Sequence, residues 1–304
     1  MKTSTASRAL ELYLSDARAR VDAVLERWGQ GSDVLWRPPV AAAVRYSLLS
    51  AGKRLRPTLV LAAYEAVGGD APGVAELAAA VEVVHAYSLV HDDLPCMDND
   101  DLRRGRPTTH RAFDVRTATE AGYHMVALAA RVLAAGLDAL GLDSERREGI
   151  ALELYRAAGA GGMIGGQALD LEAEGRRLPV PELEQVHARK TGALIAAACV
   201  IGGLAAGAAP ASCEALRGYG ADVGLAFQVY DDVLDATATS HQLGKTAGKD
   251  AAHNKPNYVA ALGLAGAKAR AAELRDHAHA ALAPFTHRAA RLRNLAELII
   301  VRSS

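Results

Sequence analysis

The chain has few cysteines, few aromatic residues and almost no net charge. Its three cysteines, Cys96, Cys199 and Cys213, lie far apart and follow no metal-binding or redox spacing, which argues against a disulfide framework and favours a reducing compartment. The formal net charge is −1, so total charge does not favour a nucleic acid or an anionic membrane as partner. Aromatic residues make up 5% of the chain, and its apolar half is rich in alanine and leucine, which suits helix more than sheet.

Long uninterrupted hydrophobic runs are also scarce. Residues 1–28 mix charged and apolar residues at helical spacing, which predicts a first helix rather than a signal peptide. The stretch from Thr191 to Pro210 has the length of a membrane span, but alanine and glycine, its main residues, drive insertion weakly. We therefore expect a buried core helix there, no membrane span, and a cytoplasmic location.

Apolar residues recur at helical spacing in several stretches. One stripe, from Leu77 to His91, predicts a helix that begins near Ala75 and ends before Pro95. Similar patterns occupy residues 41–49, 125–140, 220–235 and 265–282, and no long stretch alternates as a strand does. The sequence predicts an all-α protein, a single domain over residues 1–304, built as a bundle of about ten helices joined by short loops.

Two aspartate clusters stand out, DDLPCMD from Asp92 to Asp98 and DDVLD from Asp231 to Asp235. In the second, Asp231 and Asp235 are four residues apart and share one face of a helix, with Gln228 one turn earlier. In the first, Asp92 and Asp98 would not share a helical face. A proline between them stops the helix, so we expect Asp98 to return towards Asp92 from a loop.

Converging carboxylates repel one another, which predicts either a shifted proton or a hard cation between them. Mg²⁺ suits this pattern because it binds through one or two carboxylates together with phosphate oxygens. Aspartate runs are otherwise solvated surface or helix caps, although two clusters favour a site. A calcium loop starting at Asp98 fails, because DNDDLRRG lacks the required glycine and the terminal glutamate.

Two basic segments accompany the acidic ones. GKRLRP runs from Gly52 to Pro57, and LRRGRPT runs from Leu102 to Thr108. Arginine and lysine bind phosphate oxygens, so the pattern predicts two anions, one held by metal and one without it. A solvated basic turn is the other interpretation of each segment. GKTAGKD (residues 244–250) fails the P-loop pattern, and GAGGMIGGQ (residues 159–167) fails the dinucleotide fingerprint, so the latter predicts close helix packing.

Taken together, these motifs resemble the trans-polyprenyl diphosphate synthase family, specifically bacterial farnesyl or geranyl and plant geranylgeranyl diphosphate synthases. The resemblance extends over nearly the whole chain and rests on GKRLRP, VHAYSLVHDDLPCMDNDDLRRGRPT, GGQALDLEAEG, KTGALI, GLAFQVYDDVLD, LGKTAGKD and KPNYVAALG. It implies an isoprenoid synthase bundle with a central active-site cavity, a homodimer, and about three Mg²⁺ ions, for which Mn²⁺ can substitute.

The resemblance also assigns roles to residues. Metal ions bridging the allylic diphosphate would be bound by Asp92, Asp98 and Asp231, supported by Asp93, Asp232 and Asp235. Contacts to the same diphosphate would come from Arg103, Lys190 and Lys245, whereas isopentenyl diphosphate would be held by Lys53, Arg56, His85 and Arg104. Thr191 and Gln228 would line the reacting end of the allyl group.

The implied reaction is ionisation of an allylic diphosphate, condensation with isopentenyl diphosphate, and loss of a proton. Tyr87 and Ser88 precede the first aspartates, and the Tyr87 ring is expected to limit the product to farnesyl diphosphate, with geranyl or geranylgeranyl diphosphate as alternatives. A Tyr87 packed in the core without this role is the other interpretation.

One segment departs from the family pattern. FDVRTATEAGYHMVAL, from Phe113 to Leu128, replaces a run that lies near the product cavity and subunit contact in relatives. Two rival functions remain, a class I terpene cyclase and a non-catalytic modifying subunit. The first matches poorly at Asp235 and Thr239, and such subunits commonly lose the aspartate clusters retained here.

Overall fold

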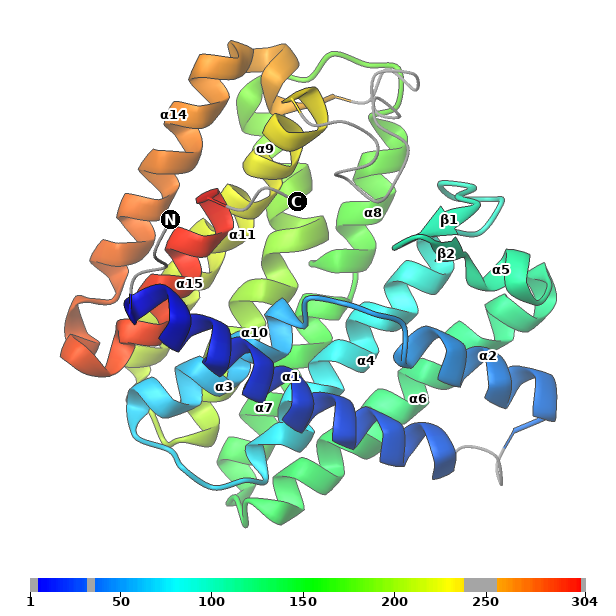
Figure 1. Ribbon diagram of the computed structural model, residues 1–304, viewed down its shortest axis with the longest axis horizontal. Helices are drawn as coiled ribbons and strands as arrows, with labels where there is room; N and C mark the ends of the chain where they lie inside the picture. The colour runs from blue at the N-terminus through cyan, green and yellow to red at the C-terminus, as the bar shows by residue number, and fades with distance from the viewer. Residues whose placement is uncertain (1–4, 32–35, 238–255, 302–304) are drawn as a thin grey trace. The chain divides into compact units, whose positions relative to one another are not determined.

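The computed structural model describes residues 5–31, 36–237 and 256–301. Its contacts divide the chain into two compact units, one of Met1–Leu61 with Ala71–Asp143 and one of Ala62–Asp70 with Ser144–Ser304. Both units are built mainly of helices (Figure 1), which confirms the predicted all-α class. The single domain and the central cavity stay predictions.

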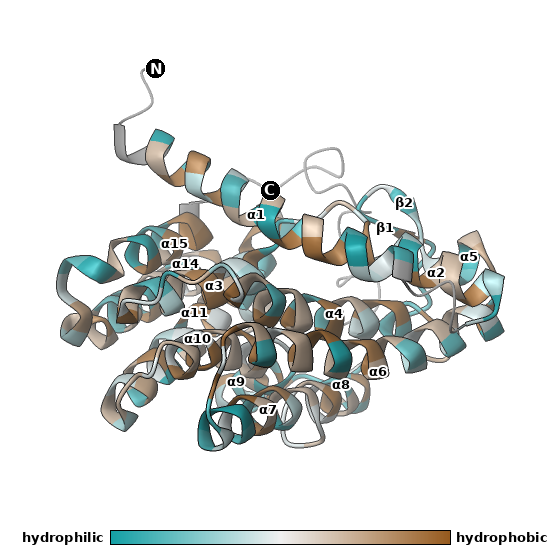
Figure 2. Cartoon of the chain, turned by 90° about the horizontal axis from the view of Figure 1, so that it is seen from below, coloured by the Kyte–Doolittle hydropathy of each residue, from teal (hydrophilic) through white to brown (hydrophobic). Residues whose placement is uncertain are grey.

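The first unit is organised around α4 (Val74–Asp92), a helix whose residues are mostly buried. Helix α4 packs chiefly against α6 (Val115–Ala139) and also against α1 (Thr5–Gly31) and α2 (Pro38–Leu48). The unit also contains the start of α3 (Leu55–Val67), the short helix α5 (Thr109–Ala112), and an antiparallel hairpin of β1 (Leu102–Arg103) and β2 (Arg106–Pro107), which Figure 1 shows beside α5. Hydrophilic and hydrophobic residues alternate along α1 (Figure 2), as the sequence of this helix predicts.

The second unit is organised around α11 (Pro210–Thr237). Helix α11 packs against α14 (Tyr258–Ala281) and α10 (Ala193–Ala205), and α10 packs against α7 (Ser144–Ala158). The remaining elements are α8 (Met163–Glu172), α9 (Val180–His187), the π-helical turn η2 (Ala188–Gly192), the 3₁₀ segment η3 (Ala283–Ala289) and α15 (Ala290–Val301).

The predicted helices are present, with shifted ends. Helix α4 ends three residues before Pro95, as its sequence predicts. Helix α6 begins at Val115 rather than near Met125, because Asp114 caps it by accepting a hydrogen bond from the Thr117 amide. The first turns of this helix contain polar residues, so the apolar periodicity does not indicate where the helix begins.

Two helical stretches are long and apolar enough to cross a membrane, Val74–Asp92 and Val180–Ala205. In the structure, 78% and 72% of their apolar windows are buried inside the protein. The part from Ala193 to Ala205 is almost wholly buried, which confirms the core helix expected there.

The contact between α10 and α11 generates a test with a matched pair of glycines. A Cβ added at Gly220 would lie 2.6 Å from Ala196 Cα, whereas one added at Gly218 would find its nearest neighbour at 4.0 Å. We expect Gly220→Ala to lower the free energy of unfolding by about 1–3 kcal/mol through overpacking. Gly218→Ala should raise it by about 0.5–1 kcal/mol, since alanine is the better helix former. Urea denaturation of both variants measures these changes in the free energy of unfolding. Equal changes in the two variants would contradict the close contact of Gly220 with Ala196.

Candidate active site

The first aspartate cluster forms a turn at the end of α4. The Asp98 amide donates a 2.8 Å hydrogen bond to the Asp92 carbonyl, and the Met97 and Asn99 amides both donate to the Leu94 carbonyl. The backbone therefore returns to Asp92, as the proline in this turn predicts. Both aspartates remain partly exposed on the turn.

The second aspartate of this cluster has a different environment. Asp93 is 2% exposed, and its carboxylate accepts hydrogen bonds from Arg103, at 2.8 and 2.9 Å from Nε and 2.5 Å from Nη2. Burial raises the pKa of Asp93, although the Arg103 guanidinium opposes this shift. The pair connects the aspartate turn to the hairpin, so Asp93 holds Arg103 in place beside Asp92 and Asp98.

The two basic segments contact α4 and each other. Arg56 Nη1 lies 3.3 Å from His85 Nε2, and Arg104 Nη1 donates a 2.9 Å hydrogen bond to the Ala51 carbonyl. Burial lowers the pKa of His85 well below its usual 6.5, and the nearby Arg56, Arg104 and Arg103 lower it further. His85 is therefore neutral at pH 7 and can accept a hydrogen bond from Arg56.

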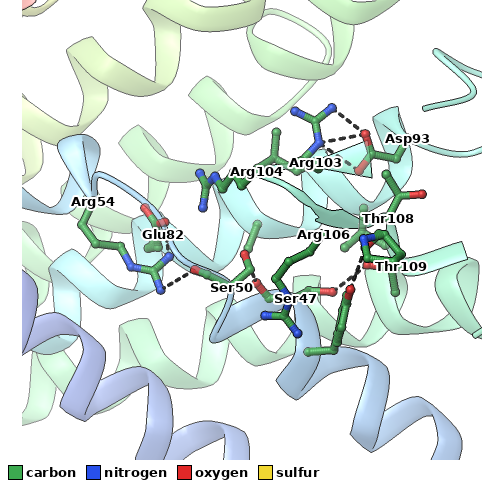
Figure 3. A pocket seen from close by; sticks show the side chains of 15 residues that line it. Ser47, Ser50, Arg54, Glu82, Asp93, Arg103, Arg104, Arg106, Thr108 and Thr109 are labelled. Atoms are coloured by element: carbon green, nitrogen blue, oxygen red, sulfur yellow. Dashed lines mark hydrogen bonds and ion pairs between the residues drawn. The ribbon is translucent and has the colours of Figure 1, made fainter. Parts of the chain in front are cut away.

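A cavity of about 40 Å³ lies between α2, α4 and the hairpin within this unit (Figure 3). Hydroxyl and guanidinium groups dominate its polar lining, which includes Ser47, Ser50, Arg54, Arg103, Arg104, Arg106, Thr108 and Thr109. The acidic members, Glu82 and Asp93, are paired with Arg54 and Arg103. The cavity wall thus carries more positive than negative charge, as a neighbour of a phosphate site would.

The second aspartate cluster lies near the end of α11, within the second unit. Gln228, Asp231 and Asp235 are partly exposed and follow one another at helical spacing, as predicted. Asp232 is 8% exposed, and its Oδ2 accepts a 2.7 Å hydrogen bond from the Tyr258 amide at the start of α14. As in the first cluster, the second aspartate of the motif bonds to the protein itself.

The same unit places Lys190 and Thr191 on the π-helical turn η2. Lys190 Nζ lies 2.5 Å from Asp170 Oδ2 on α8, and Thr191 Oγ1 donates a 3.2 Å hydrogen bond to Gln228 Oε1. Single π turns are frequent at functional sites because they redirect side chains within a helix. Helix α8 approaches this turn so closely that a Cβ at Gly166 would lie 2.1 Å from the Lys190 amide nitrogen, in agreement with the predicted close packing.

The predicted residues are distributed over the two units. Lys53, Arg56, His85, Asp92, Asp93, Asp98, Arg103 and Arg104 belong to the first unit, and Lys190, Thr191, Gln228, Asp231, Asp232 and Asp235 belong to the second. Lys245 lies outside the described residues. Of the predicted chain-length residues, Tyr87 is 7% exposed and Ser88 is 8% exposed. Burial and Asp92 raise the pKa of Tyr87 to about 12, so its phenol is neutral.

The donor chemistry fits Mg²⁺ without a full protein cage. Among the described residues, no three His, Cys, Asp or Glu side chains form a metal-binding group. Mg²⁺ usually binds one or two carboxylates and takes its other ligands from water and phosphate oxygens. The turn that brings the Asp98 backbone back to Asp92 carries two aspartates, the residue type that such a site needs.

The atypical segment of α6 has partners of its own in the first unit. Glu120 pairs with Arg37 and Arg116, and the His124 ring lies 5.1 Å from the Trp36 ring. The Tyr123 ring meets His91 edge-on at 5.3 Å. These contacts give structural reasons for several residues that depart from the family pattern.

Asp170 and Arg54 lie inside two of the motifs, although the sequence predicts no role for either of them. Asp170 belongs to GGQALD and pairs with Lys190. Arg54 belongs to GKRLRP, where Lys53 and Arg56 drew attention as phosphate ligands. An acidic residue within a motif rich in small residues, and an arginine flanked by other cations, are the signals that could have marked them.

Comparison with known proteins identifies the family of this chain. A model of the polyprenyl synthetase family matches residues 37–287. Geranylgeranyl pyrophosphate synthase of Capsicum annuum is 43% identical, over 86% of this chain and 71% of that protein. Farnesyl diphosphate synthase of Bacillus subtilis is 38% identical, over 85% of this chain and 86% of that protein. The chain belongs to the polyprenyl synthetase family.

A solved structure of another protein has the same fold as this chain. The geranyltransferase of Helicobacter pylori, crystallised in complex with magnesium and isoprenyl diphosphate, has a TM-score of 0.81 and 30% identity to this chain. The match covers 98% of this chain and 97% of that one. The chain therefore has the all-α isoprenoid synthase fold.

The lowered pKa of His85 generates a prediction about pH. Between that pKa and 6.5 the unfolded chain binds a proton at this residue and the folded chain does not, so stability is complete above 6.5 and falls as the pH drops. We expect His85→Gln to weaken the loss of stability between about pH 7 and pH 5, measured by urea denaturation. His287→Gln, at an exposed position, is the control. An unchanged pH dependence in His85→Gln would contradict the shift.

Proposed function

We propose that this protein condenses isopentenyl diphosphate with dimethylallyl or geranyl diphosphate and releases farnesyl diphosphate. Family membership makes the chain a short-chain trans-prenyl transferase. The observation that carries the proposal is the return of Asp98 to Asp92 beside an arginine held by Asp93, because it joins carboxylates for metal with a cation for phosphate.

The allylic diphosphate is assigned to both aspartate clusters. Asp92, Asp98 and Asp231 would hold Mg²⁺, with Asp235 in support, and Arg103 and Lys190 would contact the phosphate oxygens directly. When bound, the metal would neutralise the departing diphosphate and so lower the barrier to an allylic carbocation. The Helicobacter pylori structure, which contains magnesium and an isoprenyl diphosphate on the same fold, supports this assignment.

Asp93 and Asp232 have a supporting role in this proposal. Asp93 orients Arg103, and Asp232 fixes the start of α14 through the Tyr258 amide. Lys190 is oriented by Asp170 in a similar way. Cations already held in place stabilise developing charge without reorganising at the moment of reaction.

Isopentenyl diphosphate is assigned to the basic segments, through Lys53, Arg56, His85 and Arg104. A neutral His85 accepts from Arg56, which leaves the guanidinium oriented for a phosphate oxygen. The double bond of this substrate attacks the allylic carbon, and the released diphosphate takes the proton that is lost. No side chain needs to be poised as a general base.

Product length is assigned to the region of Tyr87 and Ser88. The Tyr87 ring is buried and meets His91 edge-on at 6.0 Å, which restricts its movement. Geranylgeranyl diphosphate is the second candidate product, because the Capsicum annuum relative named as a geranylgeranyl pyrophosphate synthase is 43% identical to this chain. A homodimer in the cytoplasm, with Mn²⁺ able to replace Mg²⁺, completes the proposal.

Replacing Asp92 tests the metal assignment. We expect Asp92→Asn to lower kcat/KM by about 10²–10³-fold, since it removes charge that holds the cation against the leaving group. Asp101→Asn, an exposed neighbour that pairs with Arg111, should keep wild-type activity. The assay uses isopentenyl and geranyl diphosphates with titrated Mg²⁺. Equal activity of the two variants would reject the assignment.

Replacing Tyr87 tests the assignment of product length. Because the smaller side chain opens space beyond the allylic site, Tyr87→Ala should shift the main product from farnesyl to geranylgeranyl diphosphate, identified by mass spectrometry. Tyr155→Ala, at a half-exposed position on α7, should leave the product unchanged. A Tyr87→Ala enzyme with the wild-type product would show that this ring does not limit the chain.

A further inference from the structure

Arg54 is a buried arginine at the centre of the first basic segment. Its residue is 5% exposed, although the neighbouring Lys53 is exposed. The guanidinium donates to Asp22 Oδ1 at 2.8 Å, to Glu82 Oε1 at 2.7 Å, and to the carbonyls of Leu48 and Ser50 at 2.9 and 3.2 Å. Figure 3 shows the Arg54 side chain directed towards Glu82 on the cavity wall.

These bonds connect three helices to one loop. Asp22 lies on α1, Leu48 ends α2 and Glu82 lies on α4, while Arg54 itself immediately precedes α3. A buried charge is tolerated only when it is paired and hydrogen-bonded, and Arg54 meets both conditions. Burial alone would lower the pKa of Arg54, but Glu82 and Asp22 raise it above its usual value, so the guanidinium stays charged.

The backbone at Arg54 is strained. Its φ of 49° lies in the left-handed region, which residues other than glycine rarely adopt. Strain of this kind persists only where the surroundings enforce it, and it is concentrated at functional sites. The hydrogen bonds of the guanidinium supply that enforcement, so the side chain sets the direction of the loop.

The loop direction matters because of its neighbours. Lys53 and Arg56 flank Arg54, and Arg56 reaches His85, which lies one turn beyond Glu82 on α4. Two arginines of the same segment thus contact adjacent turns of α4, Arg54 at Glu82 and Arg56 at His85. On the other side, Arg104 Nη1 bonds to the Ala51 carbonyl, and a Cβ at Gly52 would lie 2.3 Å from that Nη1. A side chain at position 52 would therefore displace the end of the Arg104 side chain.

We propose that Arg54 is a positioning residue for isopentenyl diphosphate: its bonds to the buried Glu82 and the partly exposed Asp22 hold the loop that presents Lys53 and Arg56 and supports Arg104. This inference rests on the proposed function. Arg54 contacts no substrate in it and acts only through its neighbours. A misplacement of about 1 Å at such ligands can cost on the order of 10²-fold.

Substitutions at both ends of the Arg54–Asp22 bond test the proposal. Arg54→Met removes the charge, Arg54→Lys keeps it but loses the planar fork, and Asp22→Asn removes one partner on α1. Leu25→Ala, at a fully buried position on the same helix, is a control that loosens the unit and leaves the Arg54 hydrogen bonds in place. The readouts are KM for each substrate, and calorimetric binding of isopentenyl diphosphate without Mg²⁺ or allylic substrate.

We expect KM for isopentenyl diphosphate to rise by about 10- to 100-fold in Arg54→Met, less in Arg54→Lys and least in Asp22→Asn, with KM for the allylic substrate within about twofold. Metal-free binding should weaken in the same order. Leu25→Ala should lower the melting temperature and keep both KM values. If Arg54→Met does not fold, the other two variants decide.

Two results would overturn the inference, and they are distinguishable. Equal rises of both KM values, or KM values like those of Leu25→Ala, would mean that Arg54 supports the fold alone while the proposed function stands. A wild-type protein that neither binds nor extends isopentenyl diphosphate would remove the proposed function and this inference with it.

Discussion

Arg54 sits between Glu82 and Asp22 with almost no access to solvent, and much of the first unit depends on this arrangement. Removing Glu82 would leave the buried guanidinium with only the partly exposed Asp22 to balance its charge, which is more costly than losing an exposed ion pair. The pairing therefore fixes α1, α2 and α4 around a single loop. The position of that loop in turn sets the contact of Arg56 with His85 and the contact of Arg104 with Gly52.

In both aspartate motifs, the individual aspartates have different environments, which the sequence of the motif does not show. In each, the second aspartate is buried and bonds to the protein, Asp93 to Arg103 and Asp232 to the Tyr258 amide. The outer aspartates stay partly exposed, where a cation can reach them. Like-charged carboxylates at such positions need a cation to offset their repulsion. The motif thus combines a structural anchor with ligands for a metal that a diphosphate can share.

Periodicity and proline chemistry predicted much of this. The stripe that ends at His91 located α4, Pro95 predicted the return of Asp98, and the four-residue spacing placed Asp231 and Asp235 on one face of α11. These features are local, so a single stretch of sequence contains them. Lys190 and Thr191 lie on a π turn that residue spacing did not predict. This turn packs against Gly166 of α8, a contact between distant segments that local spacing does not contain.

Long-range pairing explains the other omissions. Arg54 is bonded to residues 32 positions before and 28 positions after it, and Lys190 is bonded to Asp170 from a different helix. In GKRLRP, Arg54 stands between the other two cations, but this order alone does not show that its side chain is the buried one. The start of α6 was missed for a related reason, since Asp114 acts as a cap within a segment whose polar residues interrupt the apolar pattern.

In the proposed function, the carboxylate turn and the basic loop serve one reaction between two diphosphates. The most direct measurement is mass spectrometry of the products after the purified protein is incubated with Mg²⁺, isopentenyl diphosphate and geranyl diphosphate. We expect farnesyl diphosphate, formed only when metal and both substrates are present. Cyclised product from geranyl diphosphate alone, or no product from any allylic diphosphate, would contradict it.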